Sequence, residues 1–214
     1  MTKSTITVLG GTGFIGTRLC TLLARAGHDL RVITRNRERH KHLIVLPTLR
    51  LVEADLFDDR SLHEAAAGSD VMINLVGILN ERGDDGAGFR RVHVGTTDAA
   101  LRACRQLHIP RYLHMSALHA SAQGPSHYLK SKAEAEALLA ASNVAWTIFR
   151  PSVVFGPGDS FFNRFAGLLR ITPFAFPLAC ADARFAPVFV DDVVNAVSTA
   201  MHERHTHGMA YDLC

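Results

Sequence analysis

The chain has 214 residues, of which 48% are hydrophobic and 20% are charged. At about 150 residues per domain, this length suits one domain or slightly more, and the composition is that of a folded globular protein. Disordered, collagen-like and low-complexity chains are excluded, because the 16 glycines and 8 prolines follow no period. The formal net charge of +3 is too small to predict a nucleic-acid-binding protein by itself.

The four cysteines are far apart and form no CxxC pair. They are Cys20, Cys104, Cys180 and Cys214. This spacing predicts neither a disulfide framework nor a zinc site, and it favours a reducing compartment. The first residues lack the pattern of a secretion signal, and no stretch approaches the roughly 18 apolar residues of a membrane-spanning helix. We therefore expect a cytoplasmic protein, with at most a peripheral membrane contact.

Short apolar runs alternate with helical patterns along the chain. Strands are expected at residues 5–9, 30–34, 49–53, 71–76, 112–116, 144–149, 188–190 and 211–214. Helices are expected at residues 14–26, 36–46, 61–68, 89–107, 128–141, 161–169 and 192–202. The helix from 61 to 68 would begin with a capping box formed by Ser61 and Glu64. The alternation predicts an α/β protein with a doubly wound parallel sheet, that is, a three-layer Rossmann fold.

The first strand leads directly into the sequence GGTGFIG, which is followed by a helix. The tight turn from strand to helix needs a positive φ, and the backbone must come close to a pyrophosphate and to the helix. The free amides at the start of the helix then face the phosphates. This context predicts a dinucleotide-binding site, and the alternative is an ordinary turn. The residues expected to bind the cofactor here are Gly10, Thr12, Gly13, Phe14, Ile15 and Gly16.

The segment after the second strand decides which dinucleotide is preferred. Many sites place a carboxylate here to bind the ribose 2′-hydroxyl, but this chain has Ile33-Thr34-Arg35-Asn36-Arg37. The guanidinium of Arg35 could hold a 2′-phosphate through two hydrogen bonds. We therefore predict that NADP(H) is preferred, while NAD(H) stays possible. The alternative is that the arginines, Arg37 and those beyond it above all, only solvate a surface helix.

Residues after the third and fourth strands are expected to line the same edge of the sheet. Asp55, followed by Leu56, lies where a carboxylate could accept a hydrogen bond from an adenine amino group. The alternative is an aspartate that starts a turn. Val76 and Gly77 end the fourth strand, where a glycine would let the cofactor lie close. An ordinary glycine at the end of a strand is the alternative.

Tyr128 and Lys132 are four residues apart on an expected helix, so they share one face. An ammonium near a phenol would stabilise the phenolate and lower the pKa of the tyrosine, which could then act as an acid or base. The lysine could also bind the nicotinamide ribose. Ser116, at the end of the fifth strand, could orient a substrate carbonyl. The alternatives are a surface Tyr–Lys pair and a serine that contacts only backbone.

Together these motifs make the chain resemble the extended or atypical branch of the short-chain dehydrogenase/reductases, which includes NAD(P)-dependent epimerases and dehydratases. The resemblance covers nearly the whole chain, through GGTGFIG, EADLFD, NLVG, YLKSK, RPSVVFGPGDSFFNRF and FAPVFVDDVVNAV. The last two segments are similar to a subgroup that contains the nucleotide-binding accessory subunit of mitochondrial complex I and its bacterial relatives. Similar proteins are linked to quinone biosynthesis.

The resemblance implies a sheet with strand order 3-2-1-4-5-6-7. It divides a single structural domain into a dinucleotide-binding core (residues 1–155), a small insertion on the substrate side (156–187) and a return to the core (188–214). It also implies that the segment after the sixth strand borders the nicotinamide, with Pro151 and Val153 as cofactor-binding residues.

Three features depart from the family pattern. Leu118 stands where extended enzymes usually have Ser or Thr, so Ser116 would have to take that role. His93 stands where many relatives have Asn. Family members also usually continue well beyond a YDL-type strand, so we expect part of the substrate region to be absent.

Three functions are compatible with these features. The first is an NADP-dependent oxidoreductase, epimerase or dehydratase acting on a small carbonyl or alcohol substrate. The second is a non-catalytic nucleotide-binding subunit or assembly factor, in contact with respiratory or quinone-pathway proteins or with a membrane surface. The third is a regulator that contacts nucleic acid through the basic run at 35–42, which we disfavour because the cofactor would occupy Arg35. We expect no metal site, no nucleic-acid partner, and a monomer or homodimer.

Overall fold

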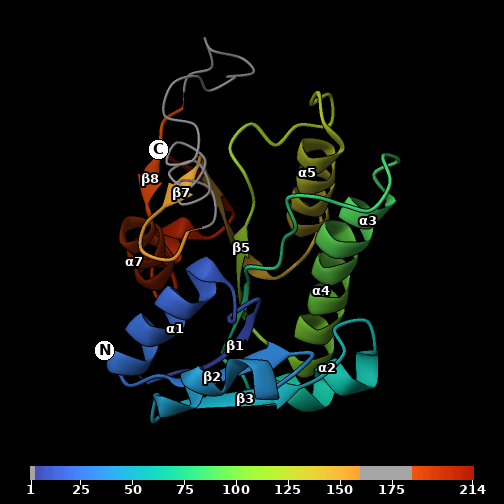
Figure 1. Cartoon of the computed structure of the whole chain (residues 1–214). Helices are drawn as coiled ribbons and strands as arrows, with labels where there is room; N and C mark the ends of the chain where they lie inside the picture. Colours follow the sequence, from blue (N-terminus) through green and yellow to red (C-terminus); the bar gives the residue numbers. More distant parts are fainter. Residues whose placement is uncertain (1–2, 160–184) are drawn as a thin grey trace.

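The computed structural model describes residues 3–159 and 185–214. Its centre is a seven-stranded parallel sheet with strand order β3-β2-β1-β4-β5-β6-β9, the order that the family resemblance implies (Figure 1). The strands are β1 Thr5–Leu9, β2 Asp29–Thr34, β3 Leu49–Glu53, β4 Val71–Asn74, β5 Arg111–Met115, β6 Ala145–Pro151 and β9 Met209–Leu213. The expected doubly wound Rossmann fold is therefore confirmed.

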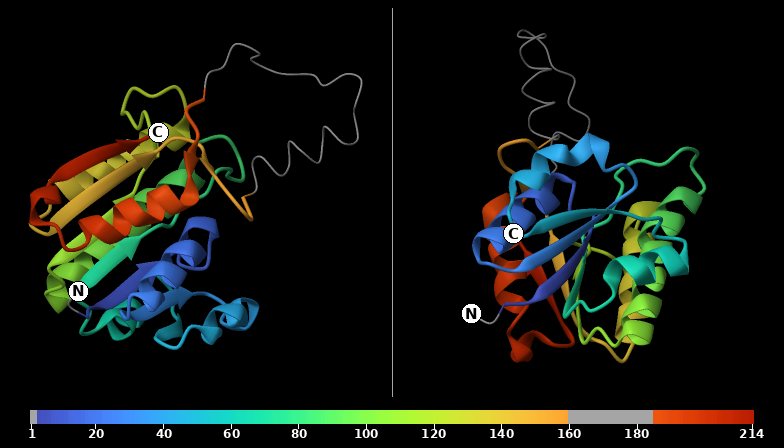
Figure 2. Two further views of the ribbon diagram at one scale, coloured as in Figure 1. Left: turned by 90° about the vertical axis from the view of Figure 1, so that its left-hand side faces the viewer. Right: turned by 90° about the horizontal axis from the view of Figure 1, so that it is seen from below.

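Helices cover both faces of the sheet, as Figure 2 shows. They are α1 Phe14–Arg25, α2 Asp59–Ala66, α3 Ala87–Phe89, α4 Thr96–Leu107, α5 His127–Ala140 and α7 Val190–Ala200. Shorter helical segments are η1 Glu38–Val45, η2 Arg90–Gly95 and η3 Arg204–Thr206. Helices α1 and α7 pack with η1 on one face, and α2, α4 and α5 pack on the other. The central strands are apolar throughout because both of their faces are buried.

Several local expectations need correction. Helix α2 begins at Asp59 and its cap is Asp58, whose side chain accepts a hydrogen bond from the Arg60 amide. Ser61 does not form the expected capping box, because its hydroxyl accepts from the Asp55 amide instead. The helix expected at 89–107 is interrupted by η2, one turn of π-helix. A second sheet contains two strands, β7 (Val154–Phe155) and β8 (Val188–Phe189). A strand was expected at 188–190, but none was expected at 154–155.

The expected helix at 161–169 and most of the expected insertion at 156–187 lie outside the described residues. In the last segment, α7 packs against α1 and β9 extends the sheet beside β6. Among residues 3–159 and 185–214, no helix is long and apolar enough to cross a membrane.

Arg111, the first residue of β5, ties this last segment to the sheet. Its side chain is buried and donates to the Ala145 and Ala200 carbonyls and to the hydroxyls of Thr147 and Thr206, at 2.6–2.9 Å. Burial lowers the pKa of Arg111 to about 10, so the guanidinium remains charged at neutral pH. The carbonyl at the C-terminal end of α7 carries partial negative charge and helps to stabilise this cation.

Replacing Arg111 with Met should lower the free energy of unfolding by about 1–3 kcal/mol, because buried acceptors lose their donor. Urea denaturation would measure this change. The matched control is Arg105→Ala, which removes an exposed arginine from α4 and should change stability by less than about 0.5 kcal/mol. Equal stabilities of the two variants would contradict the role given to Arg111.

Candidate functional site

The glycine-rich turn joins β1 to α1 with very little space between backbones. Gly10 has a φ of +77°, and a Cβ there would lie 2.9 Å from the Leu75 carbonyl carbon. A Cβ on Gly16 would lie 2.3 Å from the Gly10 oxygen, so only glycine fits at this position of α1. Gly13 begins the helix, and no side chain caps it. The first amides of α1, including those of Phe14 and Ile15, are therefore left for an anionic ligand.

A cavity of about 1100 Å³ opens over this turn at the carboxyl ends of β1 to β4. Its lining includes eight residues that the sequence predicted to bind a cofactor. These are Gly10, Thr12, Gly13, Arg35, Asp55, Leu56, Val76 and Gly77. The cavity is large enough for a dinucleotide, and its rim is polar. Because the glycines of the turn have no side chains, they leave room for a pyrophosphate.

The end of the cavity near β2 is basic. Arg39 and His40 line it together with Arg35. Nearby, one carboxylate oxygen of Asp55 accepts from the Phe57 amide at 3.0 Å, as expected for an aspartate that starts a turn, and the adenine contact stays a prediction. The guanidinium of Arg91 lies over the Phe57 ring at 5.2 Å from its centroid, and both residues line the cavity. No pattern in the sequence predicts this cation–π pair, because its members lie on separate elements.

Lys132 is not part of the cavity lining, but it lies beside Gly77, which is. Its side chain is buried in α5, and its ammonium donates to the Met115 carbonyl at the end of β5 at 3.0 Å. A Cβ on Gly77 would lie 3.4 Å from the Lys132 Nζ, so this ammonium lies directly beside the cavity lining. Burial lowers the pKa of Lys132 to about 8, while the nearby Glu136 carboxylate acts in the opposite direction.

Tyr128 lies one turn before Lys132 on α5, with its ring against Phe89 and His93. Burial raises the pKa of the phenol, which is opposite to the lowering that the sequence suggested. The physical reason is that the apolar and aromatic surroundings disfavour the phenolate, while the ammonium of Lys132 is turned to the Met115 carbonyl. The phenol is therefore protonated at neutral pH.

Ser116 does not present a free hydroxyl. It is buried, and its hydroxyl donates to the Glu136 carboxylate at 2.5 Å. Two nitrogens of the Arg150 guanidinium donate hydrogen bonds to the same carboxylate at 2.5–3.2 Å. The expected role of orienting a substrate carbonyl stays a prediction, because in this arrangement the hydroxyl donates to a carboxylate that is paired with Arg150. Glu136 was not among the expected site residues, although its position four residues after Lys132 places it on the same helix face.

His93, the residue that departs from the family pattern, is buried in η2 and connects two elements. Its Nε2 accepts from the Ile78 amide at 3.1 Å, so its Nδ1 carries the proton and donates to the Ser131 hydroxyl at 2.8 Å. Burial and the nearby Lys132 ammonium lower the pKa of His93 to about 3. The ring is therefore neutral, and it holds the segment after β4 against α5.

Pro151 and Val153 lie beyond the carboxyl end of β6. The Pro151 carbonyl accepts from the Leu118 amide, and the Val153 carbonyl accepts from the Val188 amide. Neither residue is part of the cavity lining, so their expected contact with a cofactor stays a prediction. Within the described residues, no cluster of His, Cys, Asp and Glu could hold a metal ion.

The arrangement of glycine turn, helix start and sheet-edge cavity defines a Rossmann-type dinucleotide-binding protein. A family model described as NAD(P)H-binding matches residues 10–157. The chain belongs to this NAD(P)H-binding family, and the resemblance to the short-chain dehydrogenase/reductases is confirmed.

Two curated relatives are similar over most of the chain. A mitochondrial protein of Dictyostelium discoideum, NADH dehydrogenase (ubiquinone) 1 alpha subcomplex subunit 9, is 31% identical over 210 residues, which are 96% of this chain and 58% of the relative. A ceramide reductase of Caulobacter vibrioides is 30% identical over 190 residues, which are 89% of this chain and 58% of the relative. The chain thus spans little more than half the length of either relative.

Among solved structures, a dTDP-glucose 4,6-dehydratase from Streptomyces venezuelae with NAD bound is similar, with a TM-score of 0.82. The sequence identity is 20%, and the match covers 97% of this chain and 74% of that one. At this identity the likeness shows a shared fold.

Replacing Gly16 with Ala should destabilise the protein by more than about 2 kcal/mol even without ligand, because the new Cβ meets backbone. Replacing Gly13 with Ala is the matched control, since a Cβ there lies 3.4 Å from its nearest neighbour and φ is −80°. Its unfolding temperature without ligand should be nearly unchanged, whereas its affinity for a dinucleotide should fall. Thermal unfolding with and without nucleotide measures both effects, and equal ligand-free stabilities would contradict the packing argument.

The low pKa of His93 makes stability depend on pH. The folded state binds fewer protons than the unfolded chain between the usual pKa of 6.5 and about 3, so stability is complete above pH 6.5 and falls as the pH drops through this window. His93→Gln should reduce the slope by up to about 1.4 kcal/mol per pH unit, the effect of one proton. Urea midpoints at several pH values would test this, with the exposed His42→Gln as control. A slope unaltered by His93→Gln would refute the assignment.

Proposed function

We propose that this chain forms the nucleotide-binding part of an NADP(H)-dependent oxidoreductase that acts on a carbonyl or alcohol substrate. The observation that carries the proposal is the place of Lys132, a buried ammonium beside Gly77 at the end of the dinucleotide cavity, one helical turn from Tyr128. A lysine and a tyrosine at this point can bind a ribose and transfer a proton to substrate oxygen. The name of the ceramide reductase relative supports a reductive direction.

Each of these residues would have its own role in the reduction. Bound nicotinamide supplies or accepts the hydride. Tyr128, kept protonated by its buried surroundings, donates a proton to the substrate oxygen during reduction. Lys132 binds the ribose hydroxyls while the Met115 carbonyl holds its ammonium in place. His93 joins the Ile78 amide to Ser131 of α5 through its two ring nitrogens. This would hold Tyr128 in position beside the cavity.

The basic end of the cavity supports a preference for NADP(H). Arg35, Arg39 and His40 gather there, and β2 ends without the carboxylate that would repel a 2′-phosphate. Two carboxylates, Glu53 and Asp55, also line the cavity, and they accept hydrogen bonds from the Arg37 and Phe57 amides. The two arginines can pair with a phosphate through charge-assisted hydrogen bonds.

A second candidate function is that of a non-catalytic accessory subunit that binds NADP(H). The commitment of Ser116 to Glu136 favours it, because one expected catalytic hydroxyl is unavailable for substrate. The relative named as a subunit of NADH dehydrogenase (ubiquinone) favours it as well. In this case the dinucleotide would stabilise the fold, and the partners would be respiratory or quinone-pathway proteins.

NADPH and NADP should raise the unfolding temperature more than NADH and NAD at equal concentration. A ligand at 100 times its dissociation constant adds about 2.7 kcal/mol to stability, which such a measurement detects readily. Arg35→Ala should weaken NADPH binding about tenfold or more and leave NADH binding nearly unchanged. Arg37→Ala is the control, because Arg37 does not line this cavity. Tighter binding of NADH than of NADPH would contradict the preference.

Tyr128→Phe separates the two functions. If the chain is part of a reductase, the whole protein should oxidise NADPH with a ketone from a panel of small and lipid ketones, and the variant should lose at least about 100-fold in turnover. NADPH affinity should stay within about twofold. Tyr211→Phe, a change of the same kind on β9, should leave turnover intact. Stoichiometric NADPH binding without turnover of any ketone would favour the accessory subunit.

A further inference from the structure

Phe57 and Arg91 form a contact that the functions described so far do not use. Phe57 lies between β3 and α2, and Arg91 is the second residue of η2. The Arg91 guanidinium lies over the Phe57 ring at 5.2 Å from its centroid, and both residues line the dinucleotide cavity. The pair therefore joins two segments that are far apart in the sequence, at one wall of that cavity.

The Phe57 ring is held against the backbone of η2. A Cβ on Gly95, the last residue of η2, would lie 3.2 Å from the Phe57 Cε1, so the lack of a side chain at Gly95 lets the ring approach this closely. The ring nevertheless stays 44% exposed. Large apolar side chains that stay exposed in the wall of a cavity are typical of ligand-binding sites.

The charge of Arg91 is placed differently from that of its neighbour. The preceding residue, Arg90, pairs with Glu134 at 2.9 Å. In the part of the chain that the structure describes, the Arg91 side chain takes part in no ion pair or hydrogen bond. Arg91 is exposed and one face of its guanidinium contacts Phe57, so the other face and the N–H donors are available to a ligand in the cavity.

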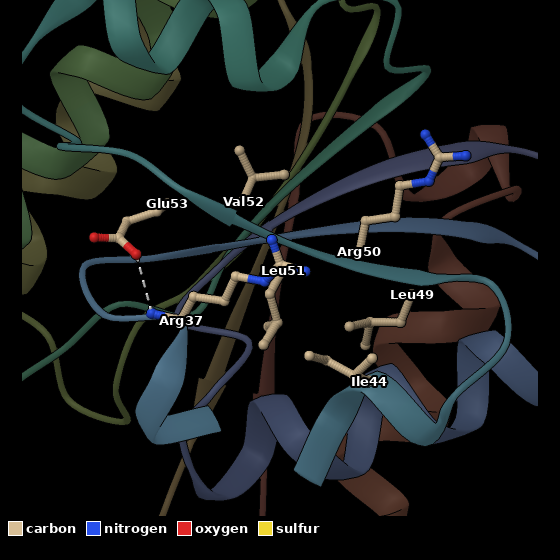
Figure 3. Close-up of a pocket in the computed structure, with 7 residues that line it drawn as sticks. All are labelled: Arg37, Ile44, Leu49, Arg50, Leu51, Val52 and Glu53. Atoms are coloured by element: carbon tan, nitrogen blue, oxygen red, sulfur yellow. Dashed lines mark hydrogen bonds between the residues drawn. The ribbon is translucent and has the colours of Figure 1, made fainter. Parts of the chain in front are cut away.

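Two carboxylates, Glu53 and Asp55, line the dinucleotide cavity close to this pair in the sequence. Glu53 also lines a smaller neighbouring cavity, where it points to Arg37 and accepts from the Arg37 amide at 3.3 Å (Figure 3). Asp55 uses one oxygen to accept from the Phe57 amide. Among the described residues no donor bonds to its other oxygen, so Asp55 offers the pair a neighbouring acceptor for a ligand.

These groups match one half of a nicotinamide dinucleotide better than the other. Leu56 and Val92, the sequence neighbours of the pair, also line the cavity and provide apolar contacts for a flat ring. Adenine is such a ring, and its exocyclic amino group is a donor for the Asp55 carboxylate. The oxidised nicotinamide ring carries a positive charge, so the Arg91 guanidinium would repel it.

We propose that Arg91 recognises the base of the cofactor, with its guanidinium plane lying on the adenine ring while Phe57 holds it in place. Arginine suits this role because its planar group stacks on aromatic rings, whereas the ammonium of lysine is a point charge. The inference rests on the nucleotide binding of the proposed function, but it does not depend on turnover. It assigns Arg91 and Arg35 to different groups, since NADPH and NADH share adenine and differ in the 2′-phosphate.

Direct titration of the full chain with NADPH and with NADH tests the proposal. Arg91→Met keeps an apolar side chain over Phe57 but removes the planar cation, so it should weaken the binding of both cofactors by about fivefold or more. Arg91→Lys should weaken binding almost as much, because the charge alone cannot stack. The matched control is Arg90→Met, which removes the adjacent arginine of η2. Arg90 does not line the cavity, so neither affinity should change by more than about twofold.

Titration with the two halves of the cofactor locates the contact on the base. Adenosine 2′,5′-bisphosphate contains the adenine, and nicotinamide mononucleotide contains the nicotinamide. Arg91→Met should weaken binding of the adenosine compound as much as that of NADPH, and it should leave binding of the nicotinamide compound unchanged. Thermal unfolding without nucleotide, on which the exposed Arg91 should have little effect, shows that each variant is folded.

A loss of affinity that affects NADPH but not NADH would overturn the inference, because that pattern belongs to a contact with the 2′-phosphate. Full affinity of Arg91→Lys would overturn it as well and would assign the residue to a phosphate. If the unaltered chain binds neither NADPH nor NADH, the proposed function fails together with the inference. If the unaltered chain binds both and Arg91→Met binds them equally well, only the inference fails.

Discussion

The contact between Gly16 and the Gly10 carbonyl is the constraint on which the architecture rests. It lets α1 start directly over the end of β1, and it leaves the first helical amides open at the sheet edge. Helix α7 then packs against α1, and the last strand follows from α7. A side chain at either glycine would push helix and strand apart. The cavity, the start of α1 and the helical layer of α1 and α7 would then no longer be aligned with the end of β1.

Helix α5 connects the dinucleotide cavity to the far half of the sheet. Tyr128, Lys132 and Glu136 succeed one another at intervals of one turn along it. Lys132 is held at the end of β5 beside the cavity, while Glu136 binds Ser116 and the Arg150 guanidinium of β6. One helix face thus performs two tasks. Its first half carries the residues proposed to serve a ligand, and its second half joins neighbouring strands by a partly buried ion pair.

The sequence could predict most of the fold because the strands are buried on both faces and read as continuous apolar runs. It could also predict eight residues of the cavity lining, since glycines, a turn and a strand end are local features. Ser116 shows where such reasoning fails. The partner of its hydroxyl lies 20 residues away on another element. The pKa of Tyr128 likewise depends on how closely Phe89 and His93 pack against it, and the π-helical turn that places His93 has no periodic signature in the sequence.

Arg111 has a consequence for the synthesis of the protein. Its guanidinium is solvated inside the fold by groups contributed between residues 145 and 206. A nascent chain that has left the ribosome only as far as β6 already contains every residue of the glycine turn and the cavity lining. It still carries the Arg111 guanidinium without two of its four acceptors, the Ala200 carbonyl and the Thr206 hydroxyl. We therefore expect β5 to reach its full stability only after α7 and η3 have been synthesised and have supplied these two acceptors.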